Sequence, residues 1–324
     1  MSLGEFELIA RYFAPEAGQR KDVVVGIGDD AAVLEPPAGM QLVVSTDTLV
    51  SGVHFPAGTA PAAVGYKALA VNLSDLAAMG ATPAWFTLNL SLPAADEVWV
   101  ADFARGLFEI AREFRLQLIG GDTTQGALAI TITVFGIVPQ GTALRRQGAR
   151  AGDRVYVTGQ LGDACLGLGV IRGTLDLPVE YHRRVLARLE RPLPRVREGE
   201  RLRGVASACI DLSDGLIADL GHIVAASGVG ARIDLPRLPL SPAYHAALGQ
   251  VGWEAALAHG DDYELCFTVP PDKQMAFHRL LPQFECGFAH IGDIEPAAGI
   301  RVFDAEGHTY TPKSRGYRHF ESAP

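Results

Sequence analysis

The chain has 324 residues, of which 48% are hydrophobic and 20% are charged, and its formal net charge is -9. This composition is ordinary for a globular enzyme, and the length is enough for two domains. The acidic balance argues against a general affinity for nucleic acid or for an anionic membrane surface.

The sequence contains no pattern that predicts export or a membrane span. The first residues, MSLGEFELIARYF, are typical of an acidic helix rather than a signal peptide. Apolar runs such as LAITITVFGIV are too short to cross a bilayer as a helix. The four cysteines lie far apart without a C-x-x-C pair, which favours reduced thiols over zinc or redox chemistry. We therefore expect a cytoplasmic protein.

The first half of the chain alternates strand patterns with helix patterns. Apolar runs predict strands at DVVVGIG, QLVVSTD, AWFTLNLSL, LQLIGG and LAITITVFGIV. One helix is predicted after Thr59, with Pro61 in its first turn, and a second covers about 95–114 with an apolar stripe. The polar stretch 140–153 then interrupts the pattern. We place a domain boundary near Gly148, with domains at 1–148 and 149–324.

The second half repeats the mixture of helices and strands. Strands are predicted at DRVYVTG, ACIDL, YELCFTV and HIGDI, and helices after Gly162 and at about 178–189, 212–226 and 243–251. The fold class is therefore α+β, with two domains that each contain a mixed sheet and helices on one face. VNLSDLAAM at 71–79 resembles IDLSDGLIA at 210–218, which leaves an internal duplication open.

Aspartates stand at the ends of many of the short apolar runs. They are Asp29, Asp30, Asp47, Asp75, Asp122, Asp211, Asp214, Asp261 and Asp262. A single aspartate there is usually a helix cap or turn former, but a carboxylate beside a buried strand must be satisfied by a cation, a donor or water. So large a set predicts a shared charged ligand. Mg²⁺, which binds carboxylates together with substrate phosphates, fits best, so the pattern predicts a magnesium-dependent enzyme acting on phosphates.

Several other phosphate and nucleophile motifs are absent from the sequence. There is no G-x-x-x-x-G-K-[ST] loop, and GLGVIRG misses the G-x-G-x-x-G spacing. No G-x-S-x-G elbow and no histidine or cysteine nucleophile motif occurs. Phosphates would then be bound through metal ions, backbone amides at glycine turns and scattered arginines.

An ordered set of segments resembles the thiamine-monophosphate kinase family. The segments are MSLGEFELIARYF, GIGDDAAV, STDTLVSGVHF, YKALAVNLSDLAAMGATPAW, LIGGDTT, CIDLSDGLIADLGHI, GDDYELCFTV and GYRHF, which together span nearly the whole chain. The family belongs to a superfamily with aminoimidazole ribonucleotide synthetase and selenophosphate synthetase. The resemblance implies a homodimer whose N-terminal domain dimerises through its sheet and binds ATP, and a C-terminal α/β domain that closes the site.

The resemblance also implies the reaction and the residues that carry it. ATP and thiamine monophosphate would give ADP and thiamine diphosphate, with several Mg²⁺ ions. The implied metal ligands are Asp30, Ser45, Thr46, Asp47, Asp75, Asp122, Asp211 and Asp214. The implied nucleotide contacts are Gly121, Asp122, Arg146 and Ser213, with Arg145 as the competing arginine. The implied contacts to thiamine monophosphate are His54, Glu264 and Tyr317.

Physical arguments qualify several of these roles. The acceptor is a phosphate oxygen that is already anionic near neutral pH, so no general base is expected. Glu264 begins an apolar strand, where an unpaired carboxylate would be poorly solvated, so a cationic ring of the substrate is its expected partner. Asp29 is expected to be a turn residue. Ser45 and Thr46 could simply bond backbone, and Tyr317 could be an ordinary packed aromatic.

Three other functions remain open at this point. A sibling synthetase of the same superfamily would keep the aspartates but change the acceptor pocket. A two-metal phosphohydrolase would also use clustered aspartates, but histidine ligands in spaced motifs would be expected. A non-catalytic nucleotide-binding module would not need the whole aspartate set.

Overall fold

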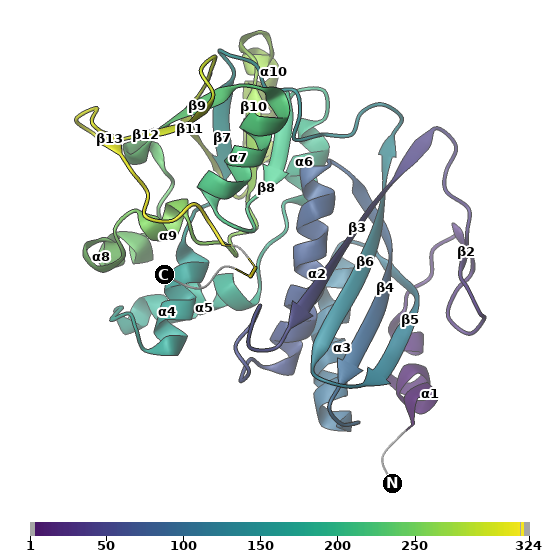
Figure 1. Cartoon of the computed structure of the whole chain (residues 1–324). Coiled ribbons are helices and arrows are strands. Elements are labelled where there is room, and N and C mark those ends of the chain that lie inside the picture. The colour runs from purple at the N-terminus through teal and green to yellow at the C-terminus, as the bar shows by residue number, and fades with distance from the viewer. Residues whose placement is uncertain (1–3, 318, 321–324) are drawn as a thin grey trace. The chain divides into compact units, whose positions relative to one another are not determined.

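Figure 1 shows the chain as a computed structural model, which describes residues 4–317 and 319–320. The chain forms two compact units, one made of Met1–Leu76 with Ala81–Ala143 and the other of Ala77–Gly80 with Leu144–Pro324. The second unit therefore begins its main part at Leu144, inside the polar stretch that interrupts the sequence pattern. The domain boundary near Gly148 itself stays a prediction.

The first unit is built on a four-stranded mixed sheet in the order β3-β6-β4-β5. Its strands are β3 (Met40–Val50), β4 (Thr82–Leu92), β5 (Gln117–Gln125) and β6 (Ala129–Pro139), and only β4 and β5 run parallel. The predicted run DVVVGIG forms the short β1 (Val23–Val25), which pairs with β2 (Val33–Leu34). A helical segment precedes them, with α1 (Glu5–Leu8), the π-helix η1 (Ile9–Phe13) and the 3-10 helix η2 (Ala14–Glu16).

One face of this sheet is covered by α2 (Pro61–Ala78) and α3 (Glu97–Glu113), as Figure 1 shows. On β4, Leu88 and Leu90 are buried on this face, whereas Asn89 between them is exposed on the other. Helix α3 starts where Asp96 accepts hydrogen bonds from the backbone of Val98 and Trp99. Its predicted apolar stripe is buried at Phe103, Leu107 and Ile110. Both predicted helices of the first half are confirmed.

The second unit contains a seven-stranded mixed sheet in the order β13-β12-β9-β11-β7-β10-β8. Its strands are β7 (Arg154–Thr158), β8 (Ala208–Asp211), β9 (Gly230–Asp234), β10 (Leu265–Val269), β11 (Phe288–Glu295), β12 (Gly299–Phe303) and β13 (Thr309–Tyr310). The helices are α4 (Asp163–Arg172), α5 (Val179–Glu190), α6 (Val196–Leu202), α7 (Leu216–Ser227), α8 (Pro242–Val251), α9 (Glu254–Leu257) and α10 (Gln274–Leu280). The 3-10 helices are η3 (Leu235–Arg237), η4 (Pro271–Lys273) and η5 (Leu281–Gln283). Only β9 and β12 pair in parallel.

The expectation that helices cover only one face of this second sheet is wrong. One face carries the large apolar core that includes Leu220 and Ile223 of α7. On the other face Phe277 of α10 packs on Tyr156 and Phe267, with ring centroids 4.8 and 5.5 Å apart. Because both faces are buried, all five residues of β10 are buried and the strand shows no alternation.

Two further sequence expectations are corrected by the structure. The helix predicted from residue 212 begins only at Leu216, because residues 212–215 form a turn that ends in Gly215 with φ of 115°. The suggested duplication also fails. Residues 71–78 lie within helix α2, whereas 210–218 cover a strand end, this turn and a helix start. In the described part of the chain, no helix has the length and apolarity needed to cross a bilayer.

Helices α2 and α3 approach each other closely enough to require glycine. A Cβ at Gly65 would overlap the carbonyl of Phe103, and a Cβ at Gly106 would overlap the carbonyl of Ala62. Glycine in the middle of a helix normally costs about 0.5–1 kcal/mol relative to alanine. At these two positions the close approach of the backbones outweighs that cost.

We predict that Gly106→Ala destabilises the protein even though alanine is the better helix former. The added methyl group would push α3 away from α2, an overpacking effect of about 1–3 kcal/mol. Gly221→Ala in α7 is the matched control, because nothing lies within 4 Å of its Cβ position. Thermal unfolding followed by circular dichroism should show a lower midpoint for Gly106→Ala and an equal or higher one for Gly221→Ala. Equal midpoints for the two variants would contradict the packing argument.

Candidate active site

Three of the predicted metal ligands meet between β3 and α2. The hydroxyl of Ser45 donates to the carboxylate of Asp75 over 2.5 Å. The backbone N–H of Asp47 donates to Asn72 Oδ1 over 3.1 Å, so Asp47 is fixed against the same helix. Asp47 pairs across the sheet with Ile132, which is fully buried, and this row of the sheet faces α2.

The neighbouring Thr46 points to the other face of the sheet. Its hydroxyl donates to the carbonyl of Ile132 over 3.2 Å and accepts from Thr133 over 3.1 Å. These contacts match the alternative in which a strand hydroxyl bonds its own sheet. The alternation of side chains along β3 therefore separates Thr46 from Ser45 and Asp47. Its predicted metal role stays a prediction.

Asp30, Gly121 and Asp122 line a pocket of about 640 Å³. The register pairs Asp122 with the exposed Asn89, so Asp122 lies on the face of the sheet opposite Asp47. Gly121 has a φ of 147°, and a Cβ there would overlap the carbonyl of Leu88. Asp29 bonds the backbone N–H of Asp30 over 2.8 Å, as expected of a turn residue.

His54 lies in the loop after β3 with its ring orientation fixed. Its Nδ1 accepts the backbone N–H of Val50 over 3.0 Å. The neutral ring therefore carries its proton on Nε2, which is the nitrogen able to donate to an anionic group. This is compatible with the predicted contact to a phosphate, which remains untested.

In the second unit, residues 212–215 form a turn that three backbone hydrogen bonds hold. The carbonyls of Leu212, Ser213 and Asp214 accept from Tyr263, Asp261 and Tyr317 over 2.8, 2.9 and 3.0 Å. This arrangement brings the predicted residues Ser213, Asp214 and Tyr317 together. Asp211 is buried at the end of β8, directly before the turn.

The carboxylate of Asp219 holds the same turn from its helix side. It accepts from the backbone N–H groups of Asp214 and Gly215 over 3.0 and 3.1 Å. Burial, followed by repulsion from Asp214, raises the pKa of Asp219 to about 7. Burial also raises the pKa of Asp214, while the charge of Arg146 acts in the opposite direction on both groups. Arg146 therefore lies within electrostatic reach of this turn. The choice between Arg145 and Arg146 as the nucleotide contact stays open.

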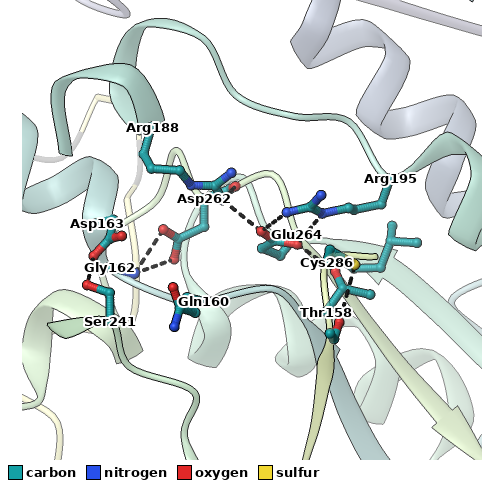
Figure 2. A network of polar contacts seen from close by, with 12 residues as sticks. Thr158, Gln160, Gly162, Asp163, Arg188, Arg195, Ser241, Asp262, Glu264 and Cys286 are labelled. Atoms are coloured by element: carbon teal, nitrogen blue, oxygen red, sulfur yellow. Dashed lines mark hydrogen bonds and ion pairs between the residues drawn. The ribbon is translucent and has the colours of Figure 1, made fainter. Parts of the chain in front are cut away.

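Glu264, whose expected partner was a ring of the substrate, also has partners within the chain. Figure 2 shows Arg188 and Arg195 reaching its carboxylate. Oε1 accepts from Arg188 over 2.7 Å and from Arg195 over 2.5 Å. Oε2 accepts from Arg195 over 2.6 Å and from Thr158 over 2.7 Å. A carboxylate has about four acceptor positions, and all are engaged. A substrate donor could reach Glu264 only if one of these donors left.

Burial and ion pairing act in opposite directions on Glu264. The side chain is fully buried, which alone would raise its pKa. The charge and hydrogen bonds of Arg195, then Arg188 and Thr158, outweigh burial and leave the pKa below its usual value. The group is therefore an anion in the folded protein at neutral pH.

Two neighbouring carboxylates complete the network in Figure 2. Asp262 accepts twice from the N–H of Gly162, over 2.9 and 3.0 Å, at the residue that precedes helix α4. Burial raises the pKa of Asp262 well above its usual value. Asp163 accepts from Arg184 over 2.9 Å and from the hydroxyl of Ser241. These contacts tie α4, α5 and α8 to the loop before β10.

Sequence reasoning missed Arg188, Arg195, Thr158 and Asp219. On α5, Arg184 and Arg188 are four residues apart, which looks like an ordinary solvated helix face. Nothing local predicts that Arg188 forms an ion pair with Glu264, a fully buried carboxylate 76 residues away. Asp219 did carry a signal, because an aspartate in the first turn of a helix often bonds nearby N–H groups.

The donors around Ser45, Asp75 and the pocket fit Mg²⁺. The described residues that line the pocket include Glu5, Asp29, Asp30 and Asp122 but no lysine or arginine. Hydroxyl and carboxylate oxygens of this kind are the ligands of a hard cation. Within the described residues, however, the one group of three possible ligands with atoms within 4.8 Å of one another is Asp304, Glu306 and His308 in the β12–β13 turn. The predicted ligands are not gathered into one such group.

Comparisons with known proteins also divide the chain into two domains. A family described as AIR synthase related protein, N-terminal domain, matches residues 28–138, and its C-terminal domain matches residues 150–305. These matches define the class of protein. The chain is a two-domain member of the AIR synthase related group, in agreement with the two units of the fold.

The relatives identify the particular family. Thiamine-monophosphate kinase from Salmonella typhimurium is 49% identical over 324 residues, which are 99% of both chains. The crystal structure of thiamine-monophosphate kinase from Stenotrophomonas maltophilia K279a is 49% identical, with a TM-score of 0.85 over 93% of this chain and 97% of that chain. A structure of AaThiL complexed with AMPPCP and TMP is 32% identical, with a TM-score of 0.77 over 99% of each chain.

The chain therefore belongs to the thiamine-monophosphate kinase family and is an enzyme, a kinase. The resemblance found in the sequence is confirmed, as is the two-domain α+β fold class. A phosphohydrolase and a non-catalytic module are excluded with it. The residue roles are not tested by these likenesses and stay predictions.

We predict that Glu264→Gln destabilises the protein by about 3–5 kcal/mol, because it leaves two largely buried arginines, 14% and 12% exposed, without a counter-charge. Asp102→Asn is the control, since it removes an exposed pair with Arg105 and should cost less than about 1 kcal/mol. Urea unfolding at neutral pH measures the free energy of unfolding of both variants.

The same prediction has a pH dependence. The folded-state pKa of Glu264 is below its unfolded value of 4.5, so its stabilising contribution is present above pH 4.5 and is lost as the pH falls through the folded pKa. The difference in the free energy of unfolding between the wild type and Glu264→Gln should therefore become smaller at acidic pH. A gap that stayed constant from pH 7 to pH 3 would contradict the ion pairs.

Proposed function

We propose that the chain transfers the γ-phosphate of ATP to thiamine monophosphate, giving ADP and thiamine diphosphate. The family supports this, because AaThiL, a relative over 99% of the chain, was solved with AMPPCP and TMP. On this chain, the supporting observation is a pocket whose wall combines Gly121 and Asp122 with Asp29 and Asp30. An acidic wall without lysine or arginine suits a nucleotide that arrives with divalent cations.

The reaction depends mainly on the positioning of ATP and thiamine monophosphate relative to each other. The acceptor oxygen of thiamine monophosphate is anionic near neutral pH, so no side chain has to remove a proton. Bound Mg²⁺ would supply neutralisation of the charge that two phosphate groups bring together. Asp30, Ser45, Thr46, Asp47, Asp75, Asp122, Asp211 and Asp214 are the proposed holders of these ions.

The remaining proposed roles concern the contacts to the nucleotide and to thiamine monophosphate. Gly121 lines the pocket and is a proposed nucleotide contact through its backbone. Ser213 and Arg146 are the proposed nucleotide contacts in the second unit. His54, through Nε2, is the proposed donor to the acceptor phosphate, and Tyr317 is a proposed contact to the rings of the substrate. Glu264 is the second proposed contact to these rings, in a state of the site in which one of its present donors has left. Orientation of this kind can contribute much of a rate enhancement.

Product analysis tests the function directly. Protein, ATP, Mg²⁺ and thiamine monophosphate should yield ADP and thiamine diphosphate, and excess chelator should abolish the reaction. ATP that is chiral at the γ-phosphate should give inverted product, because we propose a single direct in-line transfer. Absence of thiamine diphosphate would refute the assignment, whereas retention of configuration would refute only direct transfer.

We also propose that the protein is a homodimer that joins the outer faces of two sheets. Leu42 and Val44 on β3 are 50% and 55% exposed, and the register places Val44 beside Phe135 on this face. Exposed apolar side chains gathered on one sheet face are typical of an interaction surface. Asp122 lies on the same face but on β5, at the opposite edge of the sheet from β3.

Light scattering should give a molar mass of twice the 34.5 kDa of one chain. A Leu42→Asp, Val44→Asp double variant should shift the mass toward one chain, because two carboxylates on the joined face would be desolvated. Val98→Asp is the control, since Val98 is also an exposed apolar residue, at 77%, but lies on α3. A monomeric wild type would refute the dimer, as would a double variant that stayed dimeric.

A further inference from the structure

The buried carboxylate of Glu264 is shared by two positively charged side chains, as Figure 2 shows. Arg188 and Arg195 both donate to it, and the hydroxyl of Thr158 donates as well. A cationic ring that approached this carboxylate would find its oxygens occupied and would be repelled by the guanidinium groups. Contact between Glu264 and such a ring therefore requires that one of the three donors leaves.

Two of these donors are held firmly in place. Arg195 bonds both oxygens of Glu264, through Nε over 2.6 Å and Nη2 over 2.5 Å, and two parallel contacts of this kind form a strong pair. Its backbone carbonyl accepts the N–H of Gly199 over 2.9 Å at the start of α6. The hydroxyl of Thr158 donates to Glu264 over 2.7 Å and accepts the N–H of Leu265 over 2.8 Å. Neither donor can move without breaking a second contact.

Arg188 is attached to Glu264 by a single contact. Its Nη2 donates to Oε1 over 2.7 Å, and Arg195 occupies the same oxygen. The same Nη2 also donates to the backbone carbonyl of Asp262 over 3.2 Å. If Arg188 moved away, Arg195 would still bond both oxygens, so the buried carboxylate would keep a counter-charge. Arg188 is therefore the donor whose departure disturbs the network least.

We propose that Arg188 leaves Glu264 when thiamine monophosphate binds, and that the cationic thiazolium ring of the substrate takes its place. The inference rests on the proposed function, which takes Glu264 as a contact to the rings of the substrate. One positive charge replaces another beside the same carboxylate. Arg188 is then a specificity-determining residue that acts through Glu264.

This replacement favours a substrate whose ring is charged. An uncharged ring of the same shape could displace Arg188 only by leaving its charge-assisted hydrogen bond without a substitute, and such bonds are the stronger ones. A cost that falls on the wrong ligand is a common source of specificity. The occupied carboxylate also lowers the apparent affinity for the right ligand, in proportion to the fraction of molecules in which Arg188 is already displaced.

Binding of two ligands to Arg188→Met tests the proposal. Titration calorimetry of the full chain, with Mg²⁺ and a methylene-bridged ATP analogue, would compare thiamine monophosphate with deazathiamine monophosphate, in which a neutral thiophene replaces the thiazolium ring. A minor state commonly holds about 0.1–10% of the molecules, so removal of the competing arginine should strengthen the binding of thiamine monophosphate at least about tenfold. The affinity for the neutral analogue should stay the same, because that ring leaves Arg188 paired.

Two control variants separate charge from other effects. Arg188→Lys keeps a positive charge at the position and should retain the affinity of the wild type for thiamine monophosphate. Arg183→Met removes an exposed arginine from the same helix and should change neither ligand. Circular dichroism at the temperature of the titration shows whether each variant is folded.

A crystal structure of the wild type with thiamine monophosphate and the ATP analogue gives a test that needs no variant. Arg188 should lie beyond hydrogen-bond distance of Glu264, whereas both contacts from Arg195 should remain. The thiazolium ring should lie against the carboxylate. An Arg188 that was still bonded to Glu264 in this complex would overturn the proposal even if Arg188→Met failed to fold.

The outcomes distinguish this inference from the proposed function. Unchanged affinity of Arg188→Met for thiamine monophosphate, an equal gain for the neutral analogue, or an equal gain in Arg188→Lys would each overturn the role of Arg188. The kinase reaction would stand in all three cases, since product analysis of the wild type tests it separately. A wild type that did not bind thiamine monophosphate at all would overturn both.

Discussion

One buried carboxylate, that of Glu264, determines how the loops of the second unit are arranged. Moving a carboxylate out of water costs several kcal/mol, so it must be matched by good geometry and by further hydrogen bonds. The chain supplies these from β7 through Thr158, from α5 through Arg188 and from the segment before α6 through Arg195. The backbone carbonyl of Glu264 then accepts from Leu212 over 2.8 Å. The turn that carries Ser213 and Asp214 is therefore fixed by the same residue.

The buried carboxylates of the second unit and the carboxylates of the pocket in the first unit differ in their partners. In the second unit Asp163 and Glu264 have arginine partners, and Asp262 is met by the N–H before a helix. In the first unit, the described wall of the pocket has carboxylates but no lysine or arginine. Carboxylates that have arginine or N–H partners within the chain stabilise the fold, whereas carboxylates on a wall without basic residues are suited to binding a cationic ligand. The net charge of -9 therefore does not prevent nucleotide binding, provided that divalent cations come with it.

The sequence predicted regular elements well where one face is buried. Helix α3 and strand β4 show their buried stripes because each has a solvated side. Strands β9 and β12 were missed because their pairing is parallel and joins distant segments. The start of α7 was misplaced because Leu212 and Tyr263 bond across 50 residues, and this partner overrides the local helical pattern. The family was visible in ordered motifs, but the partners of Glu264 were not, since an arginine on a helix face carries no sign of its burial.

The motifs around the turn become clear only when their glycines are considered in three dimensions. A Cβ at Gly260 would overlap the carbonyl of Ser213, and a Cβ at Gly316 would approach Ala218 and the carbonyl of Asp214. Two segments therefore need glycine for the same reason, because their backbones pass against the turn at residues 212–215. The hydrogen bonds from Asp261 and Tyr317 require the same close approach. The position of Asp214 is thus set by the packing of backbone segments that are distant in the sequence. The glycine motifs at Gly260 and Gly316 can therefore be explained by this packing as well as by ligand binding.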